Sequence, residues 1–250
     1  MSQLPNLAIF SNRKVDKSKY FQKMMADDDI AIKKNQRRLV NLFIMRHLSP
    51  IPLSYQHKCL TLPGGAWAFE RSFVSGEKMP YFVGVEREQV VFERSIFYLP
   101  GRTRYSGSIP FTFPTGEVQI VHSEDAMSLH CSLSTLLTAV PAHKSLARRY
   151  KHIHSAWLDF SSAMCDEISD SLEFLPNVLA EDVPVVPVAI SVMGCRETEK
   201  YSVKGARSRA SALLGLLSKN PRVKYEVADV FSYISGTSTR METLLVLARK

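Results

Sequence analysis

From residue 58 onward the chain alternates short apolar runs with segments that carry apolar residues at helical spacing. The runs predict strands and the intervening segments predict helices. We expect strands at 58–62, 81–85, 118–122, 155–160, 183–192, 223–233 and 241–248, and helices at about 66–74, 87–97, 126–138, 164–174 and 204–219. The stretch 100–114, rich in Gly, Pro, Ser and Thr, predicts a long loop. This alternation favours a parallel α/β sheet with helical crossovers.

The last two apolar runs differ from the others because so few residues separate them. The gap, 234–240, contains Ser235, Gly236, Thr237 and Ser238 and is too short for a crossover helix. We therefore expect the final pair of strands to form an antiparallel hairpin. The predicted fold is α/β, with a Rossmann-like, mostly parallel seven-stranded sheet that ends in this hairpin.

The N-terminal part of the chain follows a different pattern. Residues 12–48 are compatible with helix, with a break or cap at the three aspartates 27–29, and the prolines at 50 and 52 end the helical region. The second of these helices has an apolar side and a basic side. We therefore divide the chain into a basic helical N-terminal extension, 1–54, and a Rossmann-like domain, 55–250.

Composition places the chain among globular proteins. Of its 250 residues, 45% are hydrophobic and 22% charged, and no apolar run is long enough to span a membrane. The N-terminus lacks an apolar signal core, so we expect a cytoplasmic protein without membrane contact. The four cysteines are widely spaced and form no CxxC pair. We therefore expect reduced thiols and no metal site.

The positive charge of the chain is concentrated near its start. Residues 1–50 contain ten Lys or Arg against four Asp, whereas the other 200 residues are nearly neutral within the total of +8. A basic extension beside a neutral domain suggests a polyanionic partner, with nucleic acid the usual candidate. The predicted contacts are Lys33, Lys34, Arg37 and Arg38, and the alternative is a solvated helix face.

A glycine turn and an acid stand at the ends of the first two predicted strands. Leu62-Pro63-Gly64-Gly65 follows the first strand, and Glu86 ends the second, 21 positions after Gly65. Glycines let the backbone approach a ligand closely, and a carboxylate at the next strand tip accepts hydrogen bonds from ribose hydroxyls. The pattern predicts an adenosine-containing ligand. An ordinary turn and a surface acid are the alternatives.

The order of elements over residues 55–250 resembles the class I S-adenosylmethionine-dependent methyltransferases, whose seven-stranded sheet ends in such a hairpin. The resemblance implies S-adenosylmethionine as cofactor. It gives four short motifs a role: Leu62, Pro63, Gly64 and Gly65 beside the methionine part, Glu86 on the ribose, Asp125 on the adenine amino group, and Asp159 as the catalytic residue near the transferred methyl group. The alternative is that Asp125 and Asp159 only cap the helices that follow them and contact neither cofactor nor substrate.

The chain also departs from the family pattern. The spacing G-x-G-x-G is absent, and Trp67 stands where small residues often lie. The fourth strand is followed by Asp159-Phe160-Ser161-Ser162 rather than a Pro-Pro turn, which speaks against methylation of exocyclic base amines. No Pro-Cys dipeptide supports a cysteine nucleophile.

RNA 2′-O-methyltransferases share the Pro-Gly-Gly turn and use a Lys-Asp-Lys-Glu set. Asp159 and Glu242 fall at plausible positions for the acids, and Lys33 or Lys34 for the first lysine. Ser191 occupies the expected position of the second lysine. We therefore do not assign this mechanism from the sequence.

Three functional hypotheses remain. The first is an S-adenosylmethionine-dependent methyltransferase-like protein that acts on RNA or DNA. The second is a catalytically inactive protein with the methyltransferase fold that serves as a nucleic-acid-binding or scaffolding module, which a pocket filled by Trp67 would favour. The third, a nicotinamide-dependent enzyme, fits the terminal hairpin less well.

Overall fold

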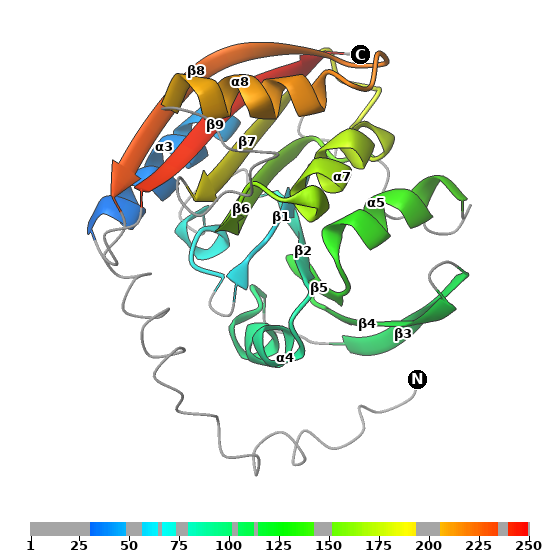
Figure 1. The fold of residues 1–250 in the computed structure, drawn as a ribbon. Helices are drawn as coiled ribbons and strands as arrows, with labels where there is room; N and C mark the ends of the chain where they lie inside the picture. Colours follow the sequence, from blue (N-terminus) through cyan, green and yellow to red (C-terminus); the bar gives the residue numbers. More distant parts are fainter. Residues whose placement is uncertain are drawn as a thin grey trace.

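One continuous mixed sheet forms the centre of the molecule (Figure 1). The structure is a computed structural model that describes residues 31–48, 57–64, 67–73, 80–101, 105–112, 115–142, 152–193, 206–234 and 240–249. Its strands are β1 Lys58–Thr61, β2 Tyr81–Glu86, β3 Tyr105–Thr112, β4 Thr115–His122, β5 Ala126–His130, β6 Ser155–Ala163, β7 Val186–Met193, β8 Lys224–Ile234 and β9 Arg240–Arg249. The α-helices are α3 Ala31–Leu48, α4 Gln89–Tyr98, α5 Leu133–Ala142, α7 Asp166–Phe174 and α8 Ala206–Leu217, with 3-10 turns at η2 Glu70–Phe73 and η3 Leu175–Asn177.

The strand order is β3-β4-β5-β2-β1-β6-β7-β9-β8. Strands β5, β2, β1, β6 and β7 are parallel, and β9 is antiparallel to both of its neighbours, β7 and β8. The predicted Rossmann-like parallel core and the terminal hairpin are therefore confirmed. The described sheet has nine strands rather than the predicted seven, because β3 and β5 were not predicted as strands. Because parallel strands end at the same edge of the sheet, the carboxyl ends of β1, β2, β5 and β6 lie side by side.

The region between α4 and α5 differs from the prediction. The expected loop 100–114 contains β3, and the expected third parallel strand is β4, which forms an antiparallel hairpin with β3. The third parallel strand is β5, where we had predicted a helix. Ala, Met and Leu are strong helix formers, but pairing with β2 and burial override that preference.

Helices beyond this region agree better with the sequence. The helices predicted at 87–97, 164–174 and 204–219 are α4, α7 and α8. The segment predicted as a helix at 66–74 forms only the short turn η2 within its described part. In the N-terminal extension, α3 confirms the second helix, and residues 12–30 lie outside the described part of the chain.

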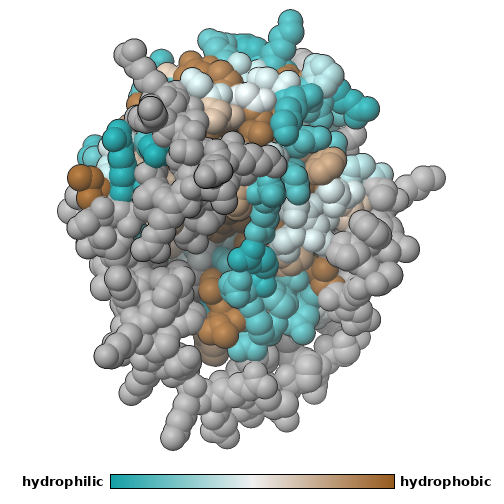
Figure 2. Space-filling view, viewed as in Figure 1, coloured by the Kyte–Doolittle hydropathy of each residue, from teal (hydrophilic) through white to brown (hydrophobic). Residues whose placement is uncertain are grey.

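Two apolar layers cover the two faces of the sheet. One contains Leu137 of α5, Leu172 of α7 and Leu217 of α8. The other contains Ile44 of α3 and Phe92 of α4. Figure 1 shows α5, α7 and α8 on the near face of the sheet and α3 behind it. In the same view, hydrophilic residues make up much of the visible described surface, and the hydrophobic ones form small separate patches (Figure 2).

Helix α3 is joined to the sheet by a buried polar contact. Gln36 Nε2 donates to Ser191 Oγ of β7 at 3.0 Å and to Thr243 Oγ1 of β9 at 3.1 Å. The two hydroxyl oxygens are 2.9 Å apart. Buried polar side chains that satisfy one another in this way fix the position of a helix on a sheet. The division predicted between 54 and 55 falls among residues 49–56, which the structure does not describe, and stays a prediction.

Trp67, two residues after the glycine pair, is buried in the core rather than exposed. Its indole Nε1 donates to the carbonyl oxygen of Ser95 in α4 at 3.0 Å, and its ring lies against Gly84 of β2. A Cβ atom on Gly84 would stand 2.5 Å from Trp67 Cη2. Trp67 has a φ of 50°, a left-handed backbone that costs about 1 kcal/mol. Complete burial of the indole offsets this cost.

Among the helices that the structure describes, none has both the length and the hydropathy needed to cross a membrane.

The contact between Trp67 and Gly84 predicts the effect of a single added methyl group. Gly84→Ala should lower the free energy of unfolding by about 1–3 kcal/mol, because the new Cβ overlaps the indole ring and the core must shift. Urea denaturation followed by circular dichroism measures this change. Gly215→Ala in α8 is the matched control, because its Cβ meets open space and alanine favours the helix by about 0.5–1 kcal/mol. Equal stability of Gly84→Ala and the wild type would contradict the described packing.

Candidate functional site

A cavity of about 280 Å³ opens at the carboxyl ends of β1, β2 and β6. Ligand-binding crevices of open parallel sheets form at this edge. The cavity is lined by side chains from α3, the β1–η2 segment, the end of β2, the start of α4, β6 and α7. They are Lys33, Arg37, Leu62, Pro63, Gly64, Ala68, Phe69, Glu70, Val85, Glu86, Arg87, Glu88, Val91, Cys131, Leu133, Trp157, Asp159, Phe160, Glu167 and Ile168.

The turn after β1 forms one wall of this cavity. Leu62, Pro63 and Gly64 line it, and Gly64 has a left-handed φ of 61°. A Cβ atom built on Gly64 would meet no other atom within 4 Å. The absence of a side chain therefore leaves open space beside the backbone, as a ligand that approaches the main chain requires. Gly65 lies outside the described residues.

Glu86 is the last residue of β2 and lines the same cavity. Its Oε1 atom is buried and has no hydrogen-bond partner among the described residues. Burial raises the pKa of Glu86 to about 8, the backbone N–H of Gly64 opposes this rise, and the charges of Glu70 and Glu88 add to it. A buried acid with an unsatisfied oxygen is costly and is typical of a ligand position.

Asp159 reaches the cavity from β6. It pairs in register with Ser191 of β7, and its neighbours Trp157 and Phe160 also line the cavity. Trp157 and Phe69 pack ring to ring, with centroids 3.9 Å apart. The structure thus places Asp159 in the same cavity lining as Leu62, Pro63, Gly64 and Glu86, and the roles of these residues stay predictions.

Asp125 is not part of this cavity. It precedes β5, and its carbonyl oxygen accepts a hydrogen bond from the N–H of Phe82 at the start of β2. Glu86 is at the other end of β2, roughly 15 Å away by the rise of a strand. The prediction placed Asp125 beside Glu86 because it took β4 for the third parallel strand. At the carboxyl end of the true third strand stands Cys131, which lines the cavity.

Several cavity residues were not assigned to the site from the sequence. Lys33 and Arg37 were predicted to contact nucleic acid, which stays a prediction, and their spacing of four places both on the inner side of α3, where they line the cavity. Lys34 and Arg38 are exposed on the outside of the helix. Cys131 is partly exposed at the cavity, and desolvation by the surrounding protein raises the pKa of its thiol to about 12 and keeps it neutral.

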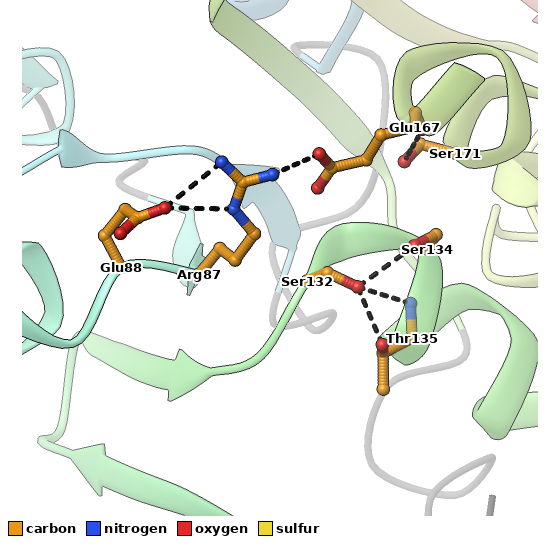
Figure 3. Close-up of polar contacts among 7 residues, drawn as sticks. All are labelled: Arg87, Glu88, Ser132, Ser134, Thr135, Glu167 and Ser171. Carbon is orange, nitrogen blue, oxygen red and sulfur yellow. Dashed lines mark hydrogen bonds and ion pairs between the residues drawn. The ribbon is translucent and has the colours of Figure 1, made fainter. Parts of the chain in front are cut away.

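Ion pairs cross the mouth of the cavity (Figure 3). Arg87 follows β2, and its guanidinium pairs with Glu88 at 3.1 Å and with Glu167 in the first turn of α7. All three residues line the cavity. Figure 3 also shows the start of α5, where Ser132 Oγ accepts a hydrogen bond from the Thr135 N–H at 3.0 Å and caps the helix.

The four positions of a Lys-Asp-Lys-Glu set are not assembled here. Lys33 and Asp159 line the cavity, but Glu242 is buried in an ion pair with Arg209 of α8 at 2.7 Å. Ser191 is held by Gln36, as described above. In the part of the chain that the structure describes, no group of three or more His, Cys, Asp or Glu is arranged to hold a metal ion.

Comparison with known proteins rests on structure. No protein-family model matches the chain, and no curated protein matches its sequence. Among solved structures, a magnesium protoporphyrin IX methyltransferase from Synechocystis with bound S-adenosylmethionine matches with a TM-score of 0.51, at 9% identity over 100% of both chains. An O-methyltransferase from Bacillus cereus in complex with S-adenosylhomocysteine matches with a TM-score of 0.51, at 10% identity over 96% of both chains.

A third similar structure has a different activity. The [4+2]-cyclase SpnF matches with a TM-score of 0.50, at 12% identity over 89% of this chain and 84% of that one. Identities this low establish architecture and leave function open. Together with the strand order and the reversed β9, they show that this chain has the fold of the class I S-adenosylmethionine-dependent methyltransferases.

Proposed function

We propose that this protein is an S-adenosylmethionine-dependent methyltransferase that acts on nucleic acid. The observation that carries the proposal is Glu86, a largely buried acid that lines the cavity next to the open backbone of Gly64. A carboxylate in this position accepts hydrogen bonds from ribose hydroxyls. The similar structures with bound S-adenosylmethionine and S-adenosylhomocysteine support the choice of ligand.

The lining of the cavity fits this cofactor. Glu86 would hold the ribose, and the main chain at Gly64 would face the methionine part. Val91, Cys131 and Leu133 provide an apolar wall for an adenine ring next to Glu86. Trp67 is absent from the lining and lies in the core, so it does not fill the pocket.

The cofactor supplies an electrophilic methyl group on a sulfonium centre, and the protein must position an acceptor and remove its proton. Asp159 at the cavity wall is the residue for both tasks, because a carboxylate can orient a nucleophile and accept a proton. Lys33 and Arg37 add positive charge to the same cavity and would favour an acceptor that carries phosphate. Phe69 and Trp157, whose rings pack against each other, form an aromatic part of the cavity wall that would contact the methyl acceptor.

The nucleic-acid part of the proposal rests on α3. Its outer side exposes Lys34, Arg38 and Arg46 at intervals of four and eight residues, while Lys33 and Arg37 face inward. Such a row offers sequence-independent phosphate contacts next to the cavity. Methyl transfer to nucleic acid in the cytoplasm is thus the function that we propose.

The second candidate is a nucleic-acid-binding module of the same fold without catalysis. The engagement of Glu242 by Arg209 and of Ser191 by Gln36 favours it, because neither residue is available to the cavity. The two candidates differ in one property, the transfer of a methyl group.

Cofactor binding is tested by calorimetry with S-adenosylmethionine and S-adenosylhomocysteine. We expect saturable binding to the wild type. At pH 9, where Glu86 is ionised, Glu86→Gln should weaken it by roughly 1–3 kcal/mol, because a charged hydrogen-bond acceptor of the ribose is lost. Glu226→Gln on β8, distant from the cavity, is the matched control and should bind like the wild type. Folded wild-type protein that gives no heat at high concentration would refute the cofactor assignment.

The same binding should depend on pH through Glu86. Its pKa of about 8 is raised, so the acid is mostly protonated at pH 7 and ionised at pH 9. Because ionised Glu86 is the better acceptor, affinity should rise with pH and be about tenfold higher at pH 9 than at pH 7. 5′-Methylthioadenosine is the suitable ligand, since it lacks an amino group that titrates in this range. Glu86→Gln should show a flat profile.

Methyl transfer is tested with radiolabelled S-adenosylmethionine and a mixed pool of RNA and single-stranded DNA. We expect label on nucleic acid with the wild type and at least a hundredfold less with Asp159→Asn, because a general base contributes about 10²–10⁴ in rate. Cofactor binding by Asp159→Asn should change little. Asp170→Asn, an exposed position on α7, is the control. Absence of transfer by wild-type protein that binds the cofactor would favour the inactive module.

A further inference from the structure

A second pocket lies near the amino ends of β2 and β5, whereas the Glu86 cavity lies at the carboxyl ends of the parallel strands. Its volume is about 420 Å³. It is formed by the end of α4 and the residues that follow it, by Asp125 just before β5, and by Arg71 of the turn η2. The lining residues are Arg71, Phe97, Tyr98, Leu99, Pro100, Gly101 and Asp125. We call it the α4 pocket.

Two aromatic side chains of the last turn of α4 are exposed at this pocket. Phe97 is 47% exposed and Tyr98 36%, whereas Phe92 and Ser95 on the inner side of the same helix are buried. Phe97 and Tyr98 are therefore not the residues that pack α4 against the core. Adjacent exposed aromatic rings at a pocket are typical of binding surfaces.

Arginine side chains accompany these rings. The guanidinium carbons of Arg71 and Arg94 each lie 6.0 Å from the centre of the Tyr98 ring. The contact holds two cations beside the aromatic surface. Aromatic rings that alternate with arginines form the platforms on which bases of single-stranded nucleic acids stack, with their phosphates near the cations.

Asp125 adds a carboxylate to the wall of the pocket. Its backbone is fixed on both sides, because its N–H donates to Ser123 Oγ at 3.2 Å and its carbonyl oxygen accepts from Phe82 at 3.0 Å. Gly101 packs tightly on this turn, since a Cβ there would lie 2.7 Å from Ser123 Oγ. An ionised carboxylate only accepts hydrogen bonds, so it selects a ligand edge that carries N–H donors.

We propose that the α4 pocket binds one guanine base of a single-stranded nucleic acid. The ring lies against Phe97 and Tyr98, and the phosphates of the strand lie near Arg71 and Arg94. Asp125 accepts hydrogen bonds from the base. Guanine is the base that fits, because its N1–H and 2-amino group are neighbouring donors that match the two oxygens of a carboxylate. This pocket extends the nucleic-acid part of the proposed function, but its occupation requires no cofactor.

Its position also suits the proposed function. The α4 pocket and the Glu86 cavity lie at opposite ends of β2, roughly 15–20 Å apart by the rise of a strand. A few nucleotides of an extended single strand cover this distance. A guanine held in the α4 pocket would therefore fix the register of the strand relative to the cavity.

Fluorescence anisotropy with labelled twelve-residue RNAs tests the proposal. The probes are oligouridine and the same strand with one central guanosine, inosine or adenosine, which avoids G-quadruplexes. We expect the guanosine strand to bind roughly tenfold more tightly than oligouridine, with inosine intermediate because it lacks the 2-amino group. Asp125→Asn should abolish the preference for guanosine. Phe97→Leu should weaken binding of all four strands by a similar factor.

The controls separate this site from the rest of the protein. Asp170→Asn should keep the preference, and Lys34→Glu with Arg38→Glu should weaken all strands without changing their ranking. A wild-type protein that binds the four strands equally would overturn the proposal, whether or not a variant folds. Retention of the guanosine preference in folded Asp125→Asn would also overturn it, as would GMP binding as tightly as the guanosine strand. Calorimetry with S-adenosylmethionine tests the cofactor separately, so failure of one claim leaves the other measurable.

Discussion

The packing of Trp67 against Gly84 holds the indole in the core and outside the cavity lining. The indole lies within the space that any side chain on Gly84 would need, and its N–H is bonded to the backbone of α4. Trp67, two positions after the glycine pair, is thereby buried in the core. The left-handed backbone at Trp67 is the conformational cost of this placement. As a result, the ends of β1 and β2 face an open cavity lined by Gly64 and Glu86.

Acidic side chains outnumber basic ones in the lining of that cavity, and the most deeply buried acids define its chemistry. Glu86 is held with an unsatisfied oxygen and a raised pKa, in a position where a ligand with hydroxyl groups would satisfy it. The cations Lys33 and Arg37 balance these acids from α3. The position of α3 depends in turn on Gln36 and its bonds to Ser191 and Thr243. A buried polar contact next to the cavity wall thus fixes the side of α3 that faces the site.

The sequence predicted the parallel core and the final hairpin because these depend on local features. The runs that became β1 and β2 are short, apolar and bounded by turn residues, and the gap before β9 is too short for a helix. It did not predict β5, whose Ala, Met and Leu favour helix until they pair with β2. Because β5 was missed, Asp125 was predicted at the carboxyl end of a parallel strand, whereas it lies just before the amino end of β5. The separation of Lys33 and Arg37 from Lys34 and Arg38 depends on partners of Gln36 that are 155 and 207 residues away, which no local pattern contains.

The central claim is that the cavity at Gly64 and Glu86 is an adenosine site, and a crystal structure with saturating S-adenosylhomocysteine tests it most directly. The account predicts ribose hydroxyls within hydrogen-bond distance of the Glu86 carboxylate, adenine against Val91 and Leu133, and Trp67 still packed on Gly84. Ligand bound away from Glu86, or a cavity closed by Trp67 at saturating ligand, would contradict it.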